Sequence, residues 1–134
     1  MKGDFLHTLT VPFYDVDALR IVWHGNYAKY FEEARCAFFA RLGMSYTELE
    51  EQGLLLPVIG MEIKYIRPCR FGETLSISVE VLSAENFLEL AYTIRKAGDG
   101  AICTRGRTRH AAVEKATGAL LFELPAEFVR RLNA

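Results

Sequence analysis

The spacing of apolar residues along the chain changes near residue 26. Apolar positions alternate loosely over residues 5–14, which predicts a strand that ends at Pro12, because proline lacks the N–H of a ladder hydrogen bond. From about Asn26 to Leu42 the apolar residues step by three or four, which predicts a long helix. Its apolar face consists of Tyr27, Tyr30, Phe31, Ala34, Ala37, Phe38 and Leu42.

Polar residues mark the end of this helix and the start of a shorter one. Gly43 suits the left-handed position that follows a helix end. Ser45 and Glu48 are three positions apart, the spacing of a capping box. We therefore expect a second helix that opens at Ser45 and stops near Gly53.

The second half of the chain has the period of two that is typical of strands. Alternation over 61–65, 74–81 and 88–94 predicts three strands, and the turn at 98–100 leads to a long strand from about Ala101 to Glu114. A further strand is expected from Leu120 to Leu124, and Pro125 suits the first residue of a closing helix.

This order of elements predicts an α+β fold in one domain that spans residues 1–134. One very apolar helix has a single sheet to cover it, and a strongly curved antiparallel sheet wrapped around the helix would do so. An exposed edge of that sheet would favour pairing with a second copy of the chain.

Composition excludes several classes of protein. Hydrophobic residues make up 51% and charged residues 25%, which is typical of globular domains, and the net charge of -1 argues against nucleic-acid binding. The N-terminal segment predicts no secretory signal, and no apolar run approaches the length that membrane insertion needs. Three cysteines without metal-ligand spacing predict no metal and a cytoplasmic setting.

Two carboxylates and a histidine gather just before the predicted long helix, in residues 14–27. Free N–H groups at a helix start can polarise a carbonyl oxygen, and a nearby carboxylate can act as nucleophile or as general base for water. The structural alternative is that Asp15 and Asp17 cap turns while His24 or Asn26 caps the helix. The residue types alone leave both interpretations open.

Residues 15–27 match the pattern D-V-D-x-x-x-x-V-W-H-G-N-Y, and Y-F-E-E-A-R follows at 30–35. With these motifs the chain resembles the hotdog-fold acyl-CoA thioesterases of the 4-hydroxybenzoyl-CoA thioesterase type, including the bacterial relatives associated with the Tol-Pal system. Residues 63–73 and 124–128 resemble two further segments of that family. The resemblance spans nearly the whole chain.

The resemblance implies a hotdog fold, with a sheet wrapped around one central helix, and a homodimer or homotetramer with the active site at the dimer interface. It places the catalytic carboxylate at Asp17 and the oxyanion-binding N–H at His24 and Gly25. It also implies substrate-binding roles for Tyr14, Asn26 and Tyr27. The family usually has glycine where this chain has Arg20, so the loop is expected either to change conformation or to present an additional charge.

Several arginines are candidates for binding the phosphates of coenzyme A. Arg105, Arg107 and Arg109 alternate along one strand and therefore share a face, and Arg67 and Arg70 are further candidates. The alternative is a solvated face paired with carboxylates of neighbouring strands.

Other reactive residues of the long helix are expected to be structural. Glu32 is spaced to pair with Arg35, and Glu33 with Lys29, although another branch of hotdog thioesterases uses a helix glutamate in catalysis. Cys36 is expected to be a small core residue. The strand residues His7 and His110 are also expected to be structural.

We therefore expect an acyl-CoA thioesterase that hydrolyses a small-molecule CoA thioester to the free acid and CoA without a cofactor. Asp17 acts as nucleophile or as general base in this hypothesis. The alternatives are a thioesterase for acyl carrier protein and a non-catalytic acyl-CoA-binding module of the same fold.

Overall fold

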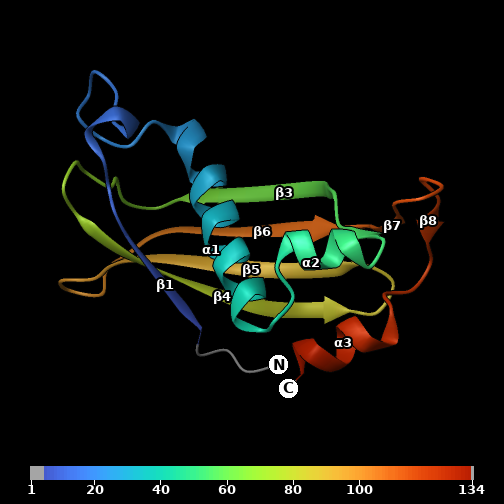
Figure 1. Ribbon diagram of the computed structural model, residues 1–134. Coiled ribbons are helices and arrows are strands. Elements are labelled where there is room, and N and C mark those ends of the chain that lie inside the picture. The colour runs from blue at the N-terminus through green and yellow to red at the C-terminus, as the bar shows by residue number, and fades with distance from the viewer. Residues whose placement is uncertain (1–4, 134) are drawn as a thin grey trace.

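The computed structural model describes residues 5–133 and contains one long helix and one large antiparallel sheet (Figure 1). The helices are α1 (Tyr27–Arg41), α2 (Tyr46–Glu51) and α3 (Ala126–Leu132). The strands are β1 (Leu6–Thr10), β2 (Leu54–Leu55), β3 (Val58–Tyr65), β4 (Thr74–Ala84), β5 (Leu88–Lys96), β6 (Ile102–His110), β7 (Ala112–Glu114) and β8 (Leu120–Leu121). Two 3₁₀ turns, η1 (Phe13–Asp15) and η2 (His24–Asn26), precede α1.

The large sheet has the strand order β1-β4-β5-β6-β3, and a small sheet has the order β2-β7-β8. Helix α1 lies across one face of the large sheet, α2 lies to its right in Figure 1, and α3 lies below α2 near the C-terminus. Strand β3 forms one edge of the large sheet, and most of its residues are exposed. This is the hotdog architecture that the resemblance implies, so the predicted α+β fold is confirmed.

Aromatic side chains fill the space between α1 and the sheet. Phe31, Phe38 and Phe39 are buried, and the Phe31 ring stacks on Tyr92 of β5 with centroids 4.6 Å apart. Gly106 of β6 lies directly beneath Phe31, and a Cβ at Gly106 would overlap the phenylalanine ring. The glycine therefore allows α1 to approach the sheet closely.

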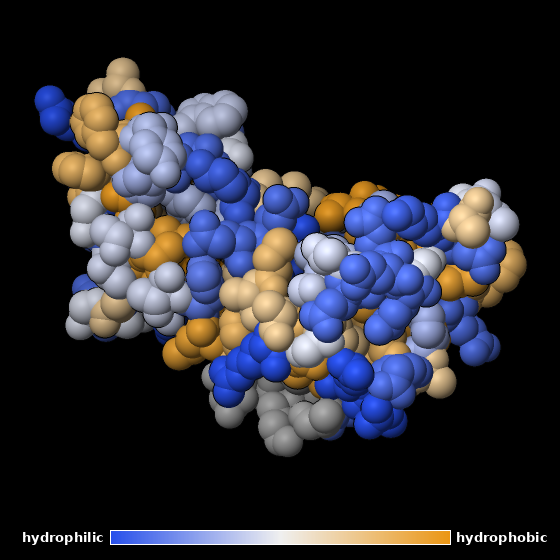
Figure 2. Space-filling model, viewed as in Figure 1, coloured by the Kyte–Doolittle hydropathy of each residue, from blue (hydrophilic) through white to orange (hydrophobic). Residues whose placement is uncertain are grey.

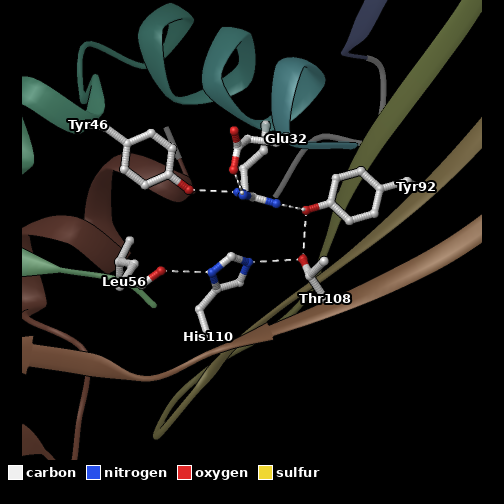
Figure 3. A network of polar contacts seen from close by, with 7 residues as sticks. Glu32, Tyr46, Leu56, Tyr92, Thr108 and His110 are labelled. Carbon is white, nitrogen blue, oxygen red and sulfur yellow. Dashed lines mark hydrogen bonds and ion pairs between the residues drawn. The ribbon is translucent and has the colours of Figure 1, made fainter. Parts of the chain in front are cut away.

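A chain of buried hydrogen bonds also joins α1 to the sheet (Figure 3). Arg35 of α1 donates from Nε to the Tyr46 hydroxyl (2.6 Å) and from Nη1 to the Tyr92 hydroxyl (3.2 Å). The Tyr92 and Thr108 hydroxyls are 2.6 Å apart, and Thr108 Oγ1 lies 2.9 Å from His110 Nε2. His110 Nδ1 lies 3.0 Å from the Leu56 carbonyl oxygen and must donate to it, because that oxygen can only accept.

The directions of the remaining bonds follow from that one. In neutral His110 the other ring nitrogen accepts, so the Thr108 hydroxyl donates to it and the Tyr92 hydroxyl donates to Thr108. Every donor and acceptor in this chain of hydrogen bonds, from Arg35 to Leu56, then has a partner. Burial lowers the pKa of His110 to about 4, which keeps the ring neutral at physiological pH. The prediction that His110 is structural is thereby confirmed.

Several local predictions are wrong in detail. The long strand expected over 101–114 breaks at Ala111, where β6 passes into the small sheet, and the final strand covers only Leu120–Leu121. Pro125 is the N-cap of α3 instead of its first residue. Cys36 is exposed instead of buried, because α1 turns this position away from the sheet.

The surface around the segment before α1 is unusually apolar. Phe13, Tyr14, Leu19 and Phe71 are more than half exposed, and Figure 2 shows apolar surface over these loops at its upper left.

No helix within residues 5–133 combines the length and the apolar character that would be needed to cross a bilayer. The predicted absence of a secretory signal involves residues 1–4, which lie outside the described part of the chain.

Candidate active site

Asp17 is the first residue of a tight turn that leads into α1. Its carbonyl accepts from the Arg20 N–H (2.8 Å), and its own N–H donates to the Ile21 carbonyl (3.0 Å). Asp17 Oδ1 accepts from the Leu19 N–H (2.9 Å), whereas Oδ2 has no hydrogen-bond partner among residues 5–133. Asp17 therefore caps a turn, as the structural alternative predicts, and still presents one free carboxylate oxygen.

Arg20 adopts a backbone conformation that favours glycine. Its φ of 65° is the only positive value found for a non-glycine residue in the described chain. The loop thus takes the left-handed conformation natural to the glycine of the family, and Arg20 adds an exposed charge. This strain is expected to cost about 1 kcal/mol.

Asp15 has a different environment from Asp17. It is 3% exposed, and its carboxylate accepts from Lys29 Nζ (2.6 Å) and from the Tyr30 hydroxyl (2.8 Å). Burial and the neighbouring Asp15 carboxylate raise the pKa of Tyr30, so this hydroxyl stays a donor. Asp15 is therefore a fixed link between the loop and α1 and not the turn cap considered above.

Two backbone N–H groups are free at the start of the helical segment. The Trp23 N–H donates to the Asp15 carbonyl (3.0 Å) and the Asn26 N–H donates to the Trp23 carbonyl (2.9 Å). Between them, the N–H groups of His24 and Gly25 have no hydrogen-bond partner among the described residues. They are suitable donors for a substrate oxygen.

The side chains of His24 and Asn26 do not cap the helix. Asn26 instead donates from Nδ2 to the Asp15 carbonyl (2.8 Å), which holds the loop against the helix start. The capping role that the alternative interpretation gives to His24 or Asn26 is therefore wrong. Gly25 lies against the indole of Trp23, and a Cβ there would overlap that ring.

A cavity of about 360 Å³ brings part of the predicted site together. Four of the predicted residues line it, namely Asp17, His24, Tyr27 and Arg67. The rest of the wall comes from Leu19, Ile21, Val22, Tyr65, Ile66 and Pro68. Asp17, His24 at the helix start and an apolar wall thus meet in one place, and Gly25 directly follows His24 in the chain.

Four other predicted residues do not line this cavity. The ring of Tyr14 is 82% exposed, with Lys29 Nζ 5.7 Å from its centroid. Gly25 and Asn26 belong to the helix start described above. Arg70 pairs its backbone with Ile21, and its N–H donates to Glu73 Oε1 (2.6 Å).

Arg105, Arg107 and Arg109 lie on the opposite face of the sheet from α1 and are exposed. Arg107 is 3.9 Å from Glu62 of β3, and the guanidinium of Arg109 lies 4.2 Å from the centroid of the Phe87 ring. Arg105 and Arg107 line a separate groove of about 590 Å³ on this face. The structure therefore does not bring these three arginines to Asp17.

The two carboxylates of α1, Glu32 and Glu33, each have a polar partner. Glu32 pairs with Arg35 (3.5 Å), as the spacing predicts. The expected pair of Lys29 with Glu33 does not form, because Lys29 binds Asp15 and Glu33 contacts His7 Nε2 at 2.7 Å. Both contacts join residues far apart in the sequence, so the helix spacing alone could not indicate them.

Tyr65 lines the cavity, although the sequence analysis assigns it no catalytic or substrate-binding role. Its hydroxyl donates to the His24 carbonyl (2.9 Å), and its ring contacts those of His24 and Tyr27. Its sequence signals are its place at the end of an alternating strand and its place within residues 63–73, which resemble a segment of the family. Its partner lies 41 positions away, so the contact depends on the tertiary fold.

Residues 11–132 match the thioesterase-like superfamily. The chain is 30% identical over 106 residues to a Synechocystis protein named "Putative esterase", a match that covers 78% of this chain and 64% of that protein. It is 36% identical over 66 residues to the Bacillus subtilis protein named "Putative acyl-CoA thioesterase YneP", a match that covers 49% of this chain and 48% of that protein. The matches thus span about half to two thirds of the length of these two relatives.

The fold also agrees with solved structures. A hypothetical protein from Thermus thermophilus has a TM-score of 0.87 at 25% identity, over 98% of both chains. This agreement over the whole domain confirms the hotdog fold.

Proposed function

Because the chain belongs to the thioesterase-like superfamily, we propose that it is an acyl-CoA thioesterase, which converts a CoA thioester and water to a free acid and CoA. The observation that carries this proposal is the cavity lined by both Asp17, which has one carboxylate oxygen without a partner in the described chain, and His24 at the helix start. The 4-hydroxybenzoyl-CoA type within the family stays a prediction.

The chemistry proposed for this cavity needs two groups. The free N–H groups of His24 and Gly25 donate hydrogen bonds to the thioester carbonyl oxygen and stabilise the negative charge that develops on it. Asp17 either attacks the carbonyl carbon, giving an anhydride that water then hydrolyses, or takes a proton from the attacking water. In both routes the C–S bond breaks, and the thiolate leaves and takes up a proton to give CoA. The chemistry requires no metal or cofactor.

The environments of the two loop carboxylates support Asp17 over Asp15. Lys29 and Tyr30 occupy both oxygens of Asp15, which is almost completely buried. Asp17 is partly exposed, lines the cavity and has one oxygen without a partner in the described chain. Only Asp17 can reach a substrate without first breaking the contacts of Asp15 with Lys29 and Tyr30.

For the CoA phosphates we favour Arg67, because it is the one arginine that lines the Asp17 cavity. Its Nη1 donates to the Ile102 carbonyl (2.9 Å), which leaves other guanidinium N–H groups for a phosphate. Arg105, Arg107, Arg109 and Arg70 stay secondary candidates.

We further propose that two copies pair through the exposed edge strand β3, as homodimer or homotetramer. Apolar side chains that include Val58, Ile59 and Met61 are exposed along this edge. Unpaired strand edges favour such pairing. The three free cysteines accord with a cytoplasmic setting.

The test is a thiol-release assay over a panel of acyl-CoAs, with the variants Asp17→Asn and Asp99→Asn. Asp99 is a matched control, because its Oδ1 accepts from the N–H two residues on (2.9 Å) just as that of Asp17 does, but in the β5–β6 turn. We expect Asp17→Asn to lower kcat at least about a hundredfold and Asp99→Asn to leave it unchanged.

Three results would contradict the proposal. Full activity of Asp17→Asn would show that another group carries the reaction. Release of thiol from an acylated carrier protein, with none from any acyl-CoA, would favour the carrier-protein alternative. Binding of acyl-CoA without turnover by the wild type would favour a non-catalytic module.

A further inference from the structure

Tyr65 links the edge strand β3 to the peptide at the start of the helical segment. It is the last residue of β3, and its hydroxyl donates to the His24 carbonyl at 2.9 Å. Its ring contacts the rings of both His24 and Tyr27, with centroids 6.4 and 5.4 Å apart. It also lines the cavity that contains Asp17.

The strand end that carries Tyr65 is well anchored. Tyr65 pairs with Thr104 of β6, and the N–H groups of Ile66 and Arg67 both donate to the Cys103 carbonyl (2.8 and 2.9 Å). The peptide it contacts is less constrained, because η2 is a short exposed turn without a side-chain cap. The hydroxyl therefore ties a weakly held peptide to a firmly held strand.

The His24 carbonyl and the Gly25 N–H belong to the same peptide unit. This unit is planar and trans, so the carbonyl oxygen and the N–H point in opposite directions and rotate together. A donor that fixes the carbonyl consequently fixes the direction of the N–H. Hydrogen bonding to the carbonyl also polarises the peptide and makes its N–H a stronger donor.

We propose that Tyr65 is a positioning residue that orients and polarises the Gly25 N–H through the His24 carbonyl, so that this N–H can bind the developing oxyanion. The proposal rests on the proposed function, since the oxyanion arises only if a thioester is attacked in this cavity. Tyr65 itself need not touch the reacting atoms.

The kinetic test compares Tyr65→Phe with the wild type. Phenylalanine keeps the ring contacts with His24 and Tyr27 and removes only the donor. The oxyanion forms only on the way to the transition state, so kcat should fall about fivefold, the equivalent of one neutral hydrogen bond, while KM stays within about twofold. Wild-type kcat in Tyr65→Phe would overturn the proposal.

Tyr46→Phe is the matched control. It also removes a tyrosine hydroxyl, but one that accepts from Arg35 and belongs to a residue that does not line the cavity. We expect it to lower the melting temperature and to keep kcat, whereas Tyr65→Phe lowers kcat and keeps the melting temperature. Equal losses of stability in the two variants would mean that Tyr65 has only a structural role.

A second measurement does not depend on turnover. In isotope-labelled protein, Tyr65→Phe should shift the His24 carbonyl ¹³C signal and the Gly25 amide proton signal upfield, with smaller changes elsewhere in the helix. Tyr46→Phe should leave both signals in place. Unchanged signals in Tyr65→Phe overturn the positioning role even if the wild type hydrolyses acyl-CoA. A wild type that hydrolyses no thioester refutes the proposed function, while the two signals still decide the contact.

Discussion

The buried ring of His110 should make the stability of this protein fall as the pH is lowered from 7 to 4. The ring is completely buried and already donates to the Leu56 carbonyl, and its other nitrogen accepts from Thr108. A second ring proton would face the Thr108 hydroxyl, force that group to reverse its bond, and place a charge near Arg35. Burial, which lowers the pKa from 6.5 to about 4, is the main cause of this resistance to protonation.

The size of the effect follows from the two pKa values. Between pH 6.5 and 4 the unfolded chain binds a proton at this histidine and the folded chain does not, so folding stability rises with pH over that window. The shift of about 2.5 pKa units corresponds to ~3 kcal/mol, which is fully present above pH 6.5 and lost at about pH 4.

The measurement is urea unfolding of the wild type and of His110→Gln at several pH values. His110→Gln should be less stable than the wild type at pH 7.5, because the hydrogen-bond chain is disturbed. The free energy of unfolding of the wild type, relative to that of His110→Gln, should fall by about 3 kcal/mol between pH 7.5 and pH 4, because only the wild type has a buried neutral histidine to protonate. The effect of carboxylates that titrate equally in both proteins cancels when the two free energies of unfolding are subtracted at each pH. A difference in free energy of unfolding that stays constant with pH would refute the argument.

Four further predictions concern packing, strain, assembly and substrate binding. Gly106→Ala should destabilise the fold by about 1–3 kcal/mol in urea unfolding, because the new Cβ overlaps the Phe31 ring. Arg20→Gly should raise the stability by up to about 1 kcal/mol, as it relieves a φ of 65°; a clear loss of stability would mean that the arginine side chain holds the loop. Light scattering should show a dimer or tetramer, and a stable, active monomer would exclude pairing through β3 as a requirement for activity. Arg67→Ala should raise KM for acyl-CoA with little change in kcat and leave a truncated thioester without the nucleotide unaffected, whereas an unchanged KM would place the phosphates elsewhere.

Local patterns predicted the elements of the fold well. The helix expected from about Asn26 to Leu42 is α1 at Tyr27–Arg41, and the capping box of Ser45 and Glu48 forms as expected. These signals involve residues within one or two helical turns of each other, so they depend little on the tertiary structure. The break at Ala111 could not be found in this way, because residues 110–113 contain no glycine, proline, asparagine or aspartate to mark a turn where the strand changes sheets.

The candidate site was predicted where it depends on the motif and missed where it depends on tertiary contacts. Asp17, His24, Tyr27 and Arg67 meet in one cavity, whereas the alternating arginines of β6 lie on the other face of the sheet. Alternation correctly predicts that these arginines share a face, but it does not say which face. Their exposure follows because the alternate residues Thr104, Gly106 and Thr108 take the buried face, on which Gly106 lies against Phe31 of α1.

The two aspartates show most clearly why the sequence alone could not assign their roles. Asp15 and Asp17 are chemically identical and two positions apart, and both caps and catalytic groups favour their residue type. Lys29 and Tyr30 lie on the first turns of α1 and each donate to one carboxylate oxygen of Asp15. Neither oxygen of Asp15 is therefore free to act on a substrate. The same contacts hold the loop against the helix and leave Asp17 beside the free N–H groups of the helix start. We therefore expect Asp15→Asn to lower the melting temperature and Asp17→Asn to leave it unchanged. Measuring the melting temperature and kcat of both variants would distinguish the structural carboxylate, Asp15, from the catalytic one, Asp17.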